Sequence, residues 1–123
     1  MIDHMGFGAS DYDASMKFFT AALAPLGYKV VMEGPPGAGA GIGTAHAPVL
    51  WIHPTQATPA PLHIALRAET RAEVDAFHRA ALAAGGQDNG APGLRPHYHP
   101  DYYGAFVIGP DGHNVEAVCH KPA

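Results

Sequence analysis

Short apolar runs predict three strands in the first half of the chain, at residues 2–9, 28–32 and 49–53. Residues 34–43 are rich in glycine and proline, which predicts a flexible loop that leads into a weak strand. Residues 55–61 combine prolines with polar residues and predict a linker. The pattern therefore divides the chain near its middle.

Apolar residues between the first two strands recur at the spacing of one helix face. They are Phe18, Phe19, Ala22, Leu23 and Leu26. Ser10 or Asp11 can cap the start of this helix. Gly27 can end it, because glycine readily adopts the left-handed conformation that follows many helices. The segment is predicted to be an amphipathic helix.

The second half predicts the same opening order of elements. A strand is expected at residues 62–67, followed by a helix that Thr70 caps and that Gly85 and Gly86 end. The apolar face of this helix consists of Val74, Phe77, Ala81 and Leu82. Both halves therefore begin with a strand and an amphipathic helix.

The last third of the chain predicts a long loop followed by two strands. The loop covers residues 87–101, and the strands cover residues 103–108 and 113–119. Residues 109–112, Gly-Pro-Asp-Gly, have the composition of a tight turn and join the two strands.

An offset of 59 residues aligns the two halves with each other. At this offset His4 falls on His63, Phe18 on Phe77, and Gly27 on Gly86. Three unlike residue types that agree at one offset indicate an internal repeat. We therefore predict one α+β domain, residues 1–123, with two tandem βαβββ modules at 1–54 and 62–123. The modules are expected to form a curved mixed sheet around a concave site.

The composition indicates one globular domain, since 47% of the 123 residues are apolar and the net charge is −4. The basic residues are scattered, which argues against a nucleic-acid surface. No apolar run approaches the roughly 18 residues needed to cross a bilayer, and no signal-peptide pattern is found, so a cytoplasmic protein without a membrane partner is expected. The single cysteine, Cys119, is interpreted as a core residue.

Nine histidines are unusual for a chain of this length. His4 and His63 are equivalent in the repeat, and a pseudo-twofold axis could bring them to opposite sides of one cleft. Glu116 lies in an apolar strand, where an unpaired carboxylate is costly and needs a cation, a hydrogen-bond donor or exposure. Two imidazoles and one carboxylate form open mononuclear metal sites. We therefore predict that His4, His63 and Glu116 bind one divalent metal ion.

The last strand of the first half aligns Trp51 with Glu116. Trp51 is predicted to be an apolar wall of the pocket or a core residue, and His53 is an outside candidate ligand. Residues 93–103, GLRPHYHPDYY, predict either a lid over the site or a surface loop that contacts a second copy. In the first case Arg95 could clamp an anionic group of a substrate.

Other side chains of this loop are candidates for proton transfer. His97 and His99 could shuttle protons, and Tyr102 or Tyr103 could donate to a chelated oxygen. The composition fits an ordered surface loop equally well.

Two segments resemble the module signatures of the vicinal oxygen chelate superfamily. Residues 4–19, HMGFGASDYDASMKFF, are similar to the first signature, and residues 62–66, 85–86 and 110–116 are similar to the second. The superfamily includes glyoxalase I, extradiol dioxygenases, and fosfomycin- and bleomycin-resistance proteins. The resemblance spans essentially the whole chain, is closest to the small glyoxalase-like members, and implies a homodimer and metal ligands at His4, His63 and Glu116.

The chain departs from two named members of that superfamily. Glyoxalase I has a glutamate ligand at the position that aligns with Trp51. The histidine–histidine–glutamate set matches the extradiol dioxygenases and would favour Fe or Mn, with Zn and Ni as further candidates. However, the tyrosine that the dioxygenases carry ten residues before the glutamate is Phe106 here.

Our leading hypothesis is a metalloenzyme, of lyase, isomerase or ring-cleaving dioxygenase type, that chelates a small substrate through two neighbouring oxygens. One of His97, His99 or Tyr103 would transfer protons. Substrate contacts are assigned to Trp51, Arg95, Tyr102 and Phe106. The alternative is a non-catalytic small-molecule binding protein of the bleomycin-resistance type, in which Trp51 would stack on a cationic drug.

Overall fold

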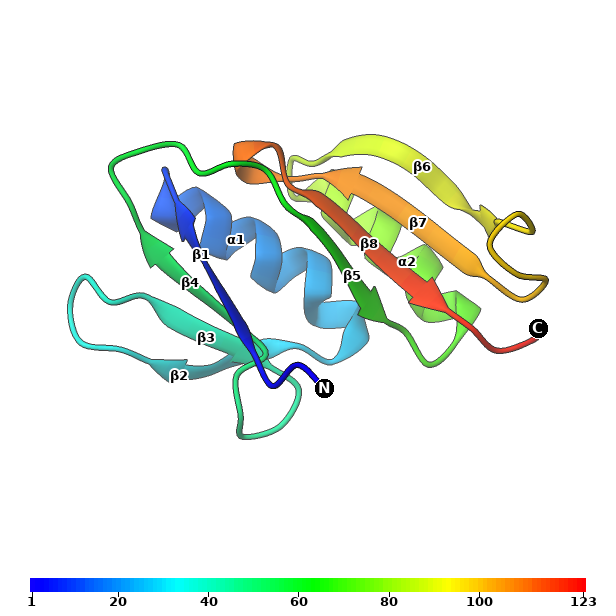
Figure 1. Cartoon of the computed structure of the whole chain (residues 1–123), viewed down its shortest axis with the longest axis horizontal. Coiled ribbons are helices and arrows are strands. Elements are labelled where there is room, and N and C mark those ends of the chain that lie inside the picture. Colours follow the sequence, from blue (N-terminus) through cyan, green and yellow to red (C-terminus); the bar gives the residue numbers. More distant parts are fainter.

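A computed structural model describes all 123 residues, and Figure 1 shows two modules side by side. The first holds β1 (Met5–Ala9), α1 (Tyr12–Leu23), β2 (Lys29–Glu33), β3 (Ala40–Gly43) and β4 (Leu50–Pro54). The second holds β5 (His63–Arg67), α2 (Arg71–Ala83), β6 (Gln87–Leu94), β7 (Tyr103–Ile108) and β8 (Asn114–Cys119). Short 3-10 turns cover Ala24–Leu26 and Pro110–Gly112. The predicted α+β fold of two βαβββ modules is confirmed.

The two sheets have equivalent topologies. Their strand orders are β1-β4-β3-β2 and β5-β8-β7-β6. In each sheet the first strand pairs in parallel with the last, and the remaining pairs are antiparallel. The sequence repeat is therefore a repeat of topology, and equivalent residues occupy equivalent strand positions in both modules.

The residues predicted to start and end the helices do so. The Asp11 side chain accepts a hydrogen bond from the backbone N–H of Ala14 at 3.1 Å, so Asp11 rather than Ser10 is the cap of α1. Thr70 caps α2 in the same way, through the backbone N–H of Glu73 at 3.1 Å. Gly27 follows α1 and its 3-10 turn with a left-handed φ of 84°.

One strand was predicted wrongly as loop. Residues 87–94, inside the expected long loop, form β6 and pair with β7 at the edge of the second sheet. The sequence QDNGAPGL contains no β-branched or aromatic residue, and its register shifts around Gly90. β6 is an edge strand, so its backbone pairs on one side only, and its bulges interrupt the alternation of side chains. Its sequence therefore gives no clear periodic signal. Leu82, predicted on the buried face of α2, is 37% exposed.

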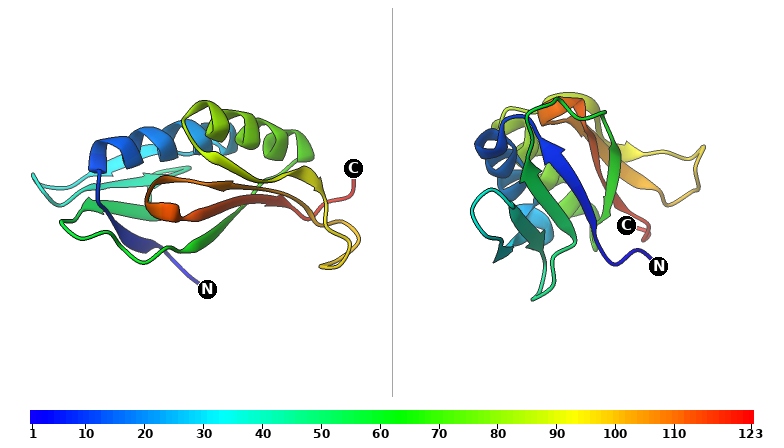
Figure 2. Two further views of the ribbon diagram at one scale, coloured as in Figure 1. Left: turned by 90° about the horizontal axis from the view of Figure 1, so that it is seen from above. Right: turned by 60° about the vertical axis from the view of Figure 1, so that its left-hand side comes forward.

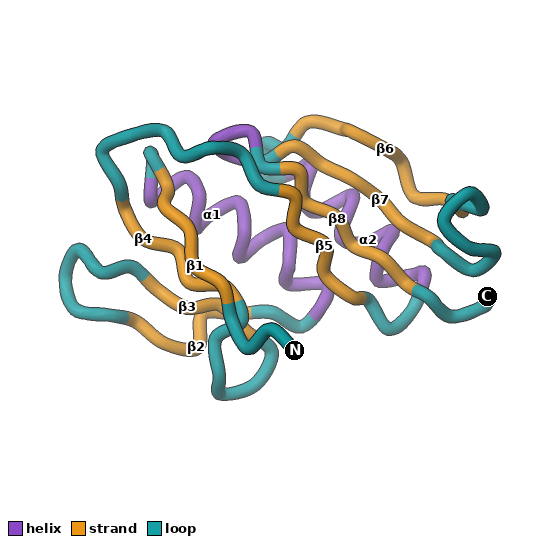
Figure 3. Tube along the Cα trace, viewed as in Figure 1, coloured by secondary structure: helices purple, strands orange, loops and turns teal.

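Both helices cover the same side of the two sheets, as Figure 2 shows, and the opposite sheet faces carry no helix (Figure 3). The apolar residues of both modules form one continuous core. Phe18 of α1 lies at the junction, because its ring occupies the space that side chains at Gly86 or Gly109 would need. Neither helix is long and apolar enough to cross a membrane.

His113 is a buried histidine at this junction, 1% exposed. Its Nδ1 accepts a hydrogen bond from the backbone N–H of Leu62 at 2.9 Å, so the neutral ring carries its proton on Nε2. Nε2 has no hydrogen-bond partner, and the ring packs edge-on against Phe7 with centroids 5.1 Å apart. Burial lowers the pKa of His113 below its ordinary value of 6.5, and Asp111 opposes this shift.

Protonation of His113 is therefore expected to destabilise the fold. Below about pH 6.5 the unfolded state binds the proton more readily than the folded state, so stability falls by up to about 1.4 kcal/mol per pH unit. Denaturant unfolding at several pH values measures this slope. His113→Asn keeps an acceptor for Leu62 but cannot titrate, and it should flatten the slope. An unchanged slope in this variant would contradict the assignment.

Candidate metal centre

Glu116 is a buried carboxylate in the middle of β8, on the sheet face that the helices do not cover. It is 1% exposed. Its Oε2 accepts a short hydrogen bond from the hydroxyl of Tyr102. Its Oε1 lies 3.1 Å from Nε2 of His63, the first residue of β5. The structure therefore brings Glu116 and His63 together, as the sequence predicts.

The hydrogen bonds of His63 define which of its nitrogens carries the proton. Nδ1 lies 3.0 Å from the carbonyl oxygen of Asn114, which can only accept, so Nδ1 must be the donor. In the neutral ring Nε2 then presents a lone pair to Oε1 of Glu116. Two acceptors at this distance require a shared cation, either a proton or a metal ion. Metal-binding histidines commonly donate their second N–H to a backbone carbonyl in this way.

Tyr102 holds the other carboxylate oxygen of Glu116. Burial and the adjacent carboxylate raise the pKa of Tyr102 far above its ordinary value of 10.0, so the hydroxyl remains a donor. Gly104 leaves room for this contact, since a Cβ there would lie 3.2 Å from both Oε2 of Glu116 and Cε1 of Tyr102. The sequence analysis did not single out this glycine.

An aromatic side chain borders the pair on β7. Phe106 is opposite Glu116 in the register, and its ring stacks on that of His63 with centroids 6.2 Å apart. The guanidinium of Arg95 lies over the ring of Phe106, 5.4 Å from the ring centroid. Arg95 also donates to the carbonyls of Gly93 and Ala91, both at 2.9 Å. These bonds hold Arg95 against the sheet edge.

His4 is not part of this cluster within one chain. It directly precedes β1, and Figure 1 shows β1 and β5 running in opposite directions. The His4 side chain is 59% exposed, and its Nδ1 lies 2.7 Å from Oδ1 of Asp3. No group of three or more His, Cys, Asp or Glu side chains within the chain could hold a metal ion.

Trp51 has in the first module the position that Glu116 has in the second. Gly6, two residues after His4, pairs with Trp51, and Ala65, two residues after His63, pairs with Glu116. Trp51 is partly exposed on the sheet face without helices. The strand register therefore agrees with the alignment of Trp51 with Glu116.

Three other predicted residues of the loop, Tyr103, His97 and His99, make their contacts elsewhere than with Glu116. Tyr103 donates to Oδ1 of Asp75 on α2 at 2.7 Å, on the helix side, so Tyr102 is the tyrosine beside Glu116. His97 is exposed and packs on Tyr98. His99 Nε2 lies 2.8 Å from Nδ1 of His120, a residue that the sequence analysis did not single out.

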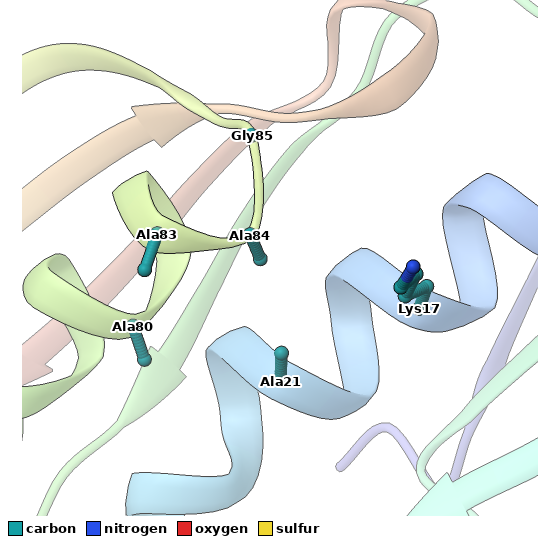
Figure 4. A pocket seen from close by; sticks show the side chains of 6 residues that line it. All are labelled: Lys17, Ala21, Ala80, Ala83, Ala84 and Gly85. Carbon is teal, nitrogen blue, oxygen red and sulfur yellow. The ribbon is translucent and has the colours of Figure 1, made fainter.

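Two hollows of the surface differ in chemistry. One, of about 390 Å³, lies at the junction and is lined by residues of β1, β4 and β5, including His63, and by Asp3 just before β1. The other, of about 640 Å³, lies between the helices and is shown in Figure 4. Its lining consists of Lys17, Ala21, Ala80, Ala83, Ala84 and Gly85. It offers no group that binds metal, so the candidate site is on the other side of the sheets.

The comparison with protein families agrees with this architecture. The family model of the Glyoxalase/Bleomycin resistance protein/Dioxygenase superfamily matches residues 1–117. The chain belongs to this superfamily. The resemblance found in the sequence is thereby confirmed at the level of the family. No curated protein matches the chain.

Solved structures of the glyoxalase superfamily share the fold. A glyoxalase/bleomycin resistance protein from Albidiferax ferrireducens is 26% identical, with a TM-score of 0.73 and 97% of both chains covered. A glyoxalase/bleomycin resistance protein/dioxygenase family enzyme from Burkholderia phytofirmans is 15% identical, with a TM-score of 0.74 and 98% of both chains covered. A glyoxalase I mutant from Zea mays is 21% identical, with a TM-score of 0.71; the match covers 95% of this chain and 46% of that one.

Proposed function

We propose that the protein is a metalloenzyme of the glyoxalase superfamily that acts on a small substrate chelated through two neighbouring oxygens. In this proposal His63 and Glu116 of one chain and His4 of a second copy bind one divalent metal ion. The observation that carries it is the contact between two acceptors, Nε2 of His63 and Oε1 of Glu116. Members of the superfamily often use a divalent metal, which supports the assignment.

The residues of the pair fit a metal ion in chemistry and in orientation. A neutral imidazole and a carboxylate suit Fe, Mn, Zn or Ni. The Asn114 carbonyl orients His63, and the Tyr102 hydroxyl orients Glu116, which is the usual arrangement around metal ligands. The Tyr102 hydroxyl satisfies one oxygen of the buried carboxylate, and a bound cation would compensate its charge at the other.

A second copy is proposed as the source of His4 because one chain cannot supply it. His4 donates from Nδ1 to Asp3, so its Nε2 presents a lone pair on an exposed side chain. The Nε2 of His63 presents a lone pair for the same reason. In a twofold dimer the first module of each copy would face the second module of the other, which gives two identical sites. Superfamily members often form dimers, which supports this arrangement.

A bound metal would supply Lewis acidity toward the two substrate oxygens. The chain itself would position the substrate and hold protons. Tyr102 holds its proton on the hydroxyl that faces Oε2 of Glu116, beside the site. Phe106 and Arg95 form one wall. Among the histidines proposed for proton transfer, His99 accepts a hydrogen bond at Nδ1 from the backbone N–H of Asp101. Its neutral ring therefore carries the proton on Nε2, from which it can pass to Nδ1 of His120.

The second candidate is a metal-free binding protein of the bleomycin-resistance type. It is favoured by the incomplete ligand set of a single chain and by the partly exposed Trp51. In that case a proton would be shared between His63 and Glu116. Metal content separates the two candidates.

Elemental analysis of protein purified without chelator tests the proposal. We expect about one divalent ion per chain, and less than about 0.1 in His63→Ala. His63→Ala should fold, since the side chain is 51% exposed. His46→Ala, an exposed loop histidine, is the matched control and should retain the metal. Wild-type protein with less than about 0.1 equivalent, and none after incubation with Mn, Fe, Zn or Ni, would refute the proposal.

A further inference from the structure

Three aromatic rings surround Tyr102, the residue whose hydroxyl donates to Glu116. Tyr98 and His99 come from the same loop, and their ring centroids lie 4.8 and 5.5 Å from that of Tyr102. The third ring belongs to His120, the first residue after β8, with its centroid at 5.4 Å. The phenol is therefore held between the loop and the end of the last strand.

His120 is held in place by its two neighbours along the chain. Cys119, the last residue of β8, pairs with Tyr103 at the start of β7. Lys121 donates to Oε2 of Glu69 at 2.6 Å. Figure 1 shows this end of the chain beside the loop that joins β6 and β7. The contacts of the two neighbours therefore place the ring of His120 next to the loop.

The hydrogen bonds of the two histidines define where their protons lie. The backbone N–H of Asp101 donates to Nδ1 of His99 at 3.1 Å, so the neutral ring of His99 carries its proton on Nε2. This Nε2 lies 2.8 Å from Nδ1 of His120, which must then be the acceptor. The two rings also stack, with centroids 5.1 Å apart and 22° between their planes. It is the only side-chain hydrogen bond between residues 95–102 and the segment after β8.

We propose that His120 is a positioning residue of the candidate metal centre, because its hydrogen bond with His99 holds Tyr102 against Glu116. Its effect on metal binding rests on the proposed function. His120 acts at two removes from the metal: it fixes His99, both imidazoles support the phenol, and the phenol orients the carboxylate. Partners that orient a metal ligand commonly change metal affinity about 10-fold to 100-fold when they are lost.

Two substitutions of His120 separate its hydrogen bond from its packing. His120→Asn keeps an acceptor near the position of Nδ1, and His120→Leu keeps a side chain of similar size without an acceptor. We expect His120→Leu to weaken binding of Mn or Zn about 10-fold, and His120→Asn to bind within about 2-fold of the wild type. His46→Leu, at an exposed loop position of the first module, is the matched control and should bind as the wild type does. An equal loss in both His120 variants, or no loss in either, would overturn the inference.

Tyr102→Phe tests whether His120 acts through Tyr102. This variant lacks the hydroxyl that meets Glu116 and should itself weaken metal binding. Adding His120→Leu should then cost less than about 2-fold more, because the contact that it disturbs is already absent. A repeat of the full loss in this background would contradict a path through Tyr102.

The ionisation of Tyr102 gives a readout that needs no metal. NMR of the Cζ carbon in ¹³C-tyrosine-labelled, metal-free protein follows it, and the signal is assigned by its absence in Tyr102→Phe. Burial and the adjacent carboxylate raise the pKa of Tyr102 far above its ordinary value of 10.0, so the wild type should keep the phenol at about pH 10.5. In His120→Leu the released phenol meets water, and its pKa should fall toward the ordinary value. His120→Asn should behave as the wild type does.

The two readouts separate this inference from the proposed function. A protein that binds metal, but in which Tyr102 ionises alike in the wild type and both His120 variants, overturns the inference alone. A protein that binds no metal, but in which His120→Leu lowers the pKa of Tyr102 and His120→Asn does not, overturns the proposed function and supports the positioning role.

Discussion

Glu116→Gln is expected to abolish metal binding and, at the same time, to stabilise the metal-free protein. The carboxamide has the size of the carboxylate, so its oxygen can still accept from Tyr102. Its NH₂ group can donate to the lone pair on Nε2 of His63, where the carboxylate presents only an acceptor. We expect metal affinity to fall about 100-fold or more. The free energy of unfolding of the metal-free protein should rise by about 1 kcal/mol.

Two measurements check this opposite pair of effects. Metal content gives the first, and denaturant unfolding after chelator treatment gives the second. Glu33→Gln, on the exposed edge strand β2, is the matched control and should change neither quantity by a measurable amount. Metal binding at the wild-type level in Glu116→Gln, or a loss of stability of about 1 kcal/mol or more, would contradict the account of the pair.

Phe18→Ala is expected to cause the largest loss of stability. Phe18 is 2% exposed, belongs to the first module, and packs against Gly86 and Gly109 of the second. The truncation leaves a cavity at the junction and should cost about 3–5 kcal/mol. Denaturant unfolding measures the loss. Leu94→Ala, at a position that is 48% exposed, should cost less than about 0.5 kcal/mol. A cost for Phe18→Ala near that of the control would show that the modules do not share one core.

The internal repeat made most of the fold predictable. The match of Phe18 with Phe77 and of Gly27 with Gly86 located both helices. The capping residues indicated where the helices start, and the apolar runs indicated the strands. β6 escaped because a bulged edge strand of polar residues and glycine has no period that distinguishes it from a loop. This segment is a strand because it pairs with β7, and the residues of the segment alone do not indicate that pairing.

The candidate site was predictable in part. The sequence grouped His63 with Glu116 in one predicted site, from the internal repeat and the cost of burying an unpaired acid, and the structure brings these two side chains together. The hydroxyl that meets Glu116 belongs to Tyr102, while Tyr103 faces α2, and two adjacent tyrosines cannot be distinguished before the strand register is known. The distance of His4 from the pair depends on how the modules are related in space, which the repeat alone does not fix.

The central claim is that the metal site is shared between two copies, and mixing two inactive variants tests it most directly. His4→Ala and His63→Ala should each bind no metal alone. Unfolding and refolding them together produces mixed dimers in which one of the two sites has all three ligands, so the mixture should recover about a quarter of an equivalent per chain. A mixture that binds no metal, or His4→Ala protein that binds a full equivalent by itself, would contradict the shared site.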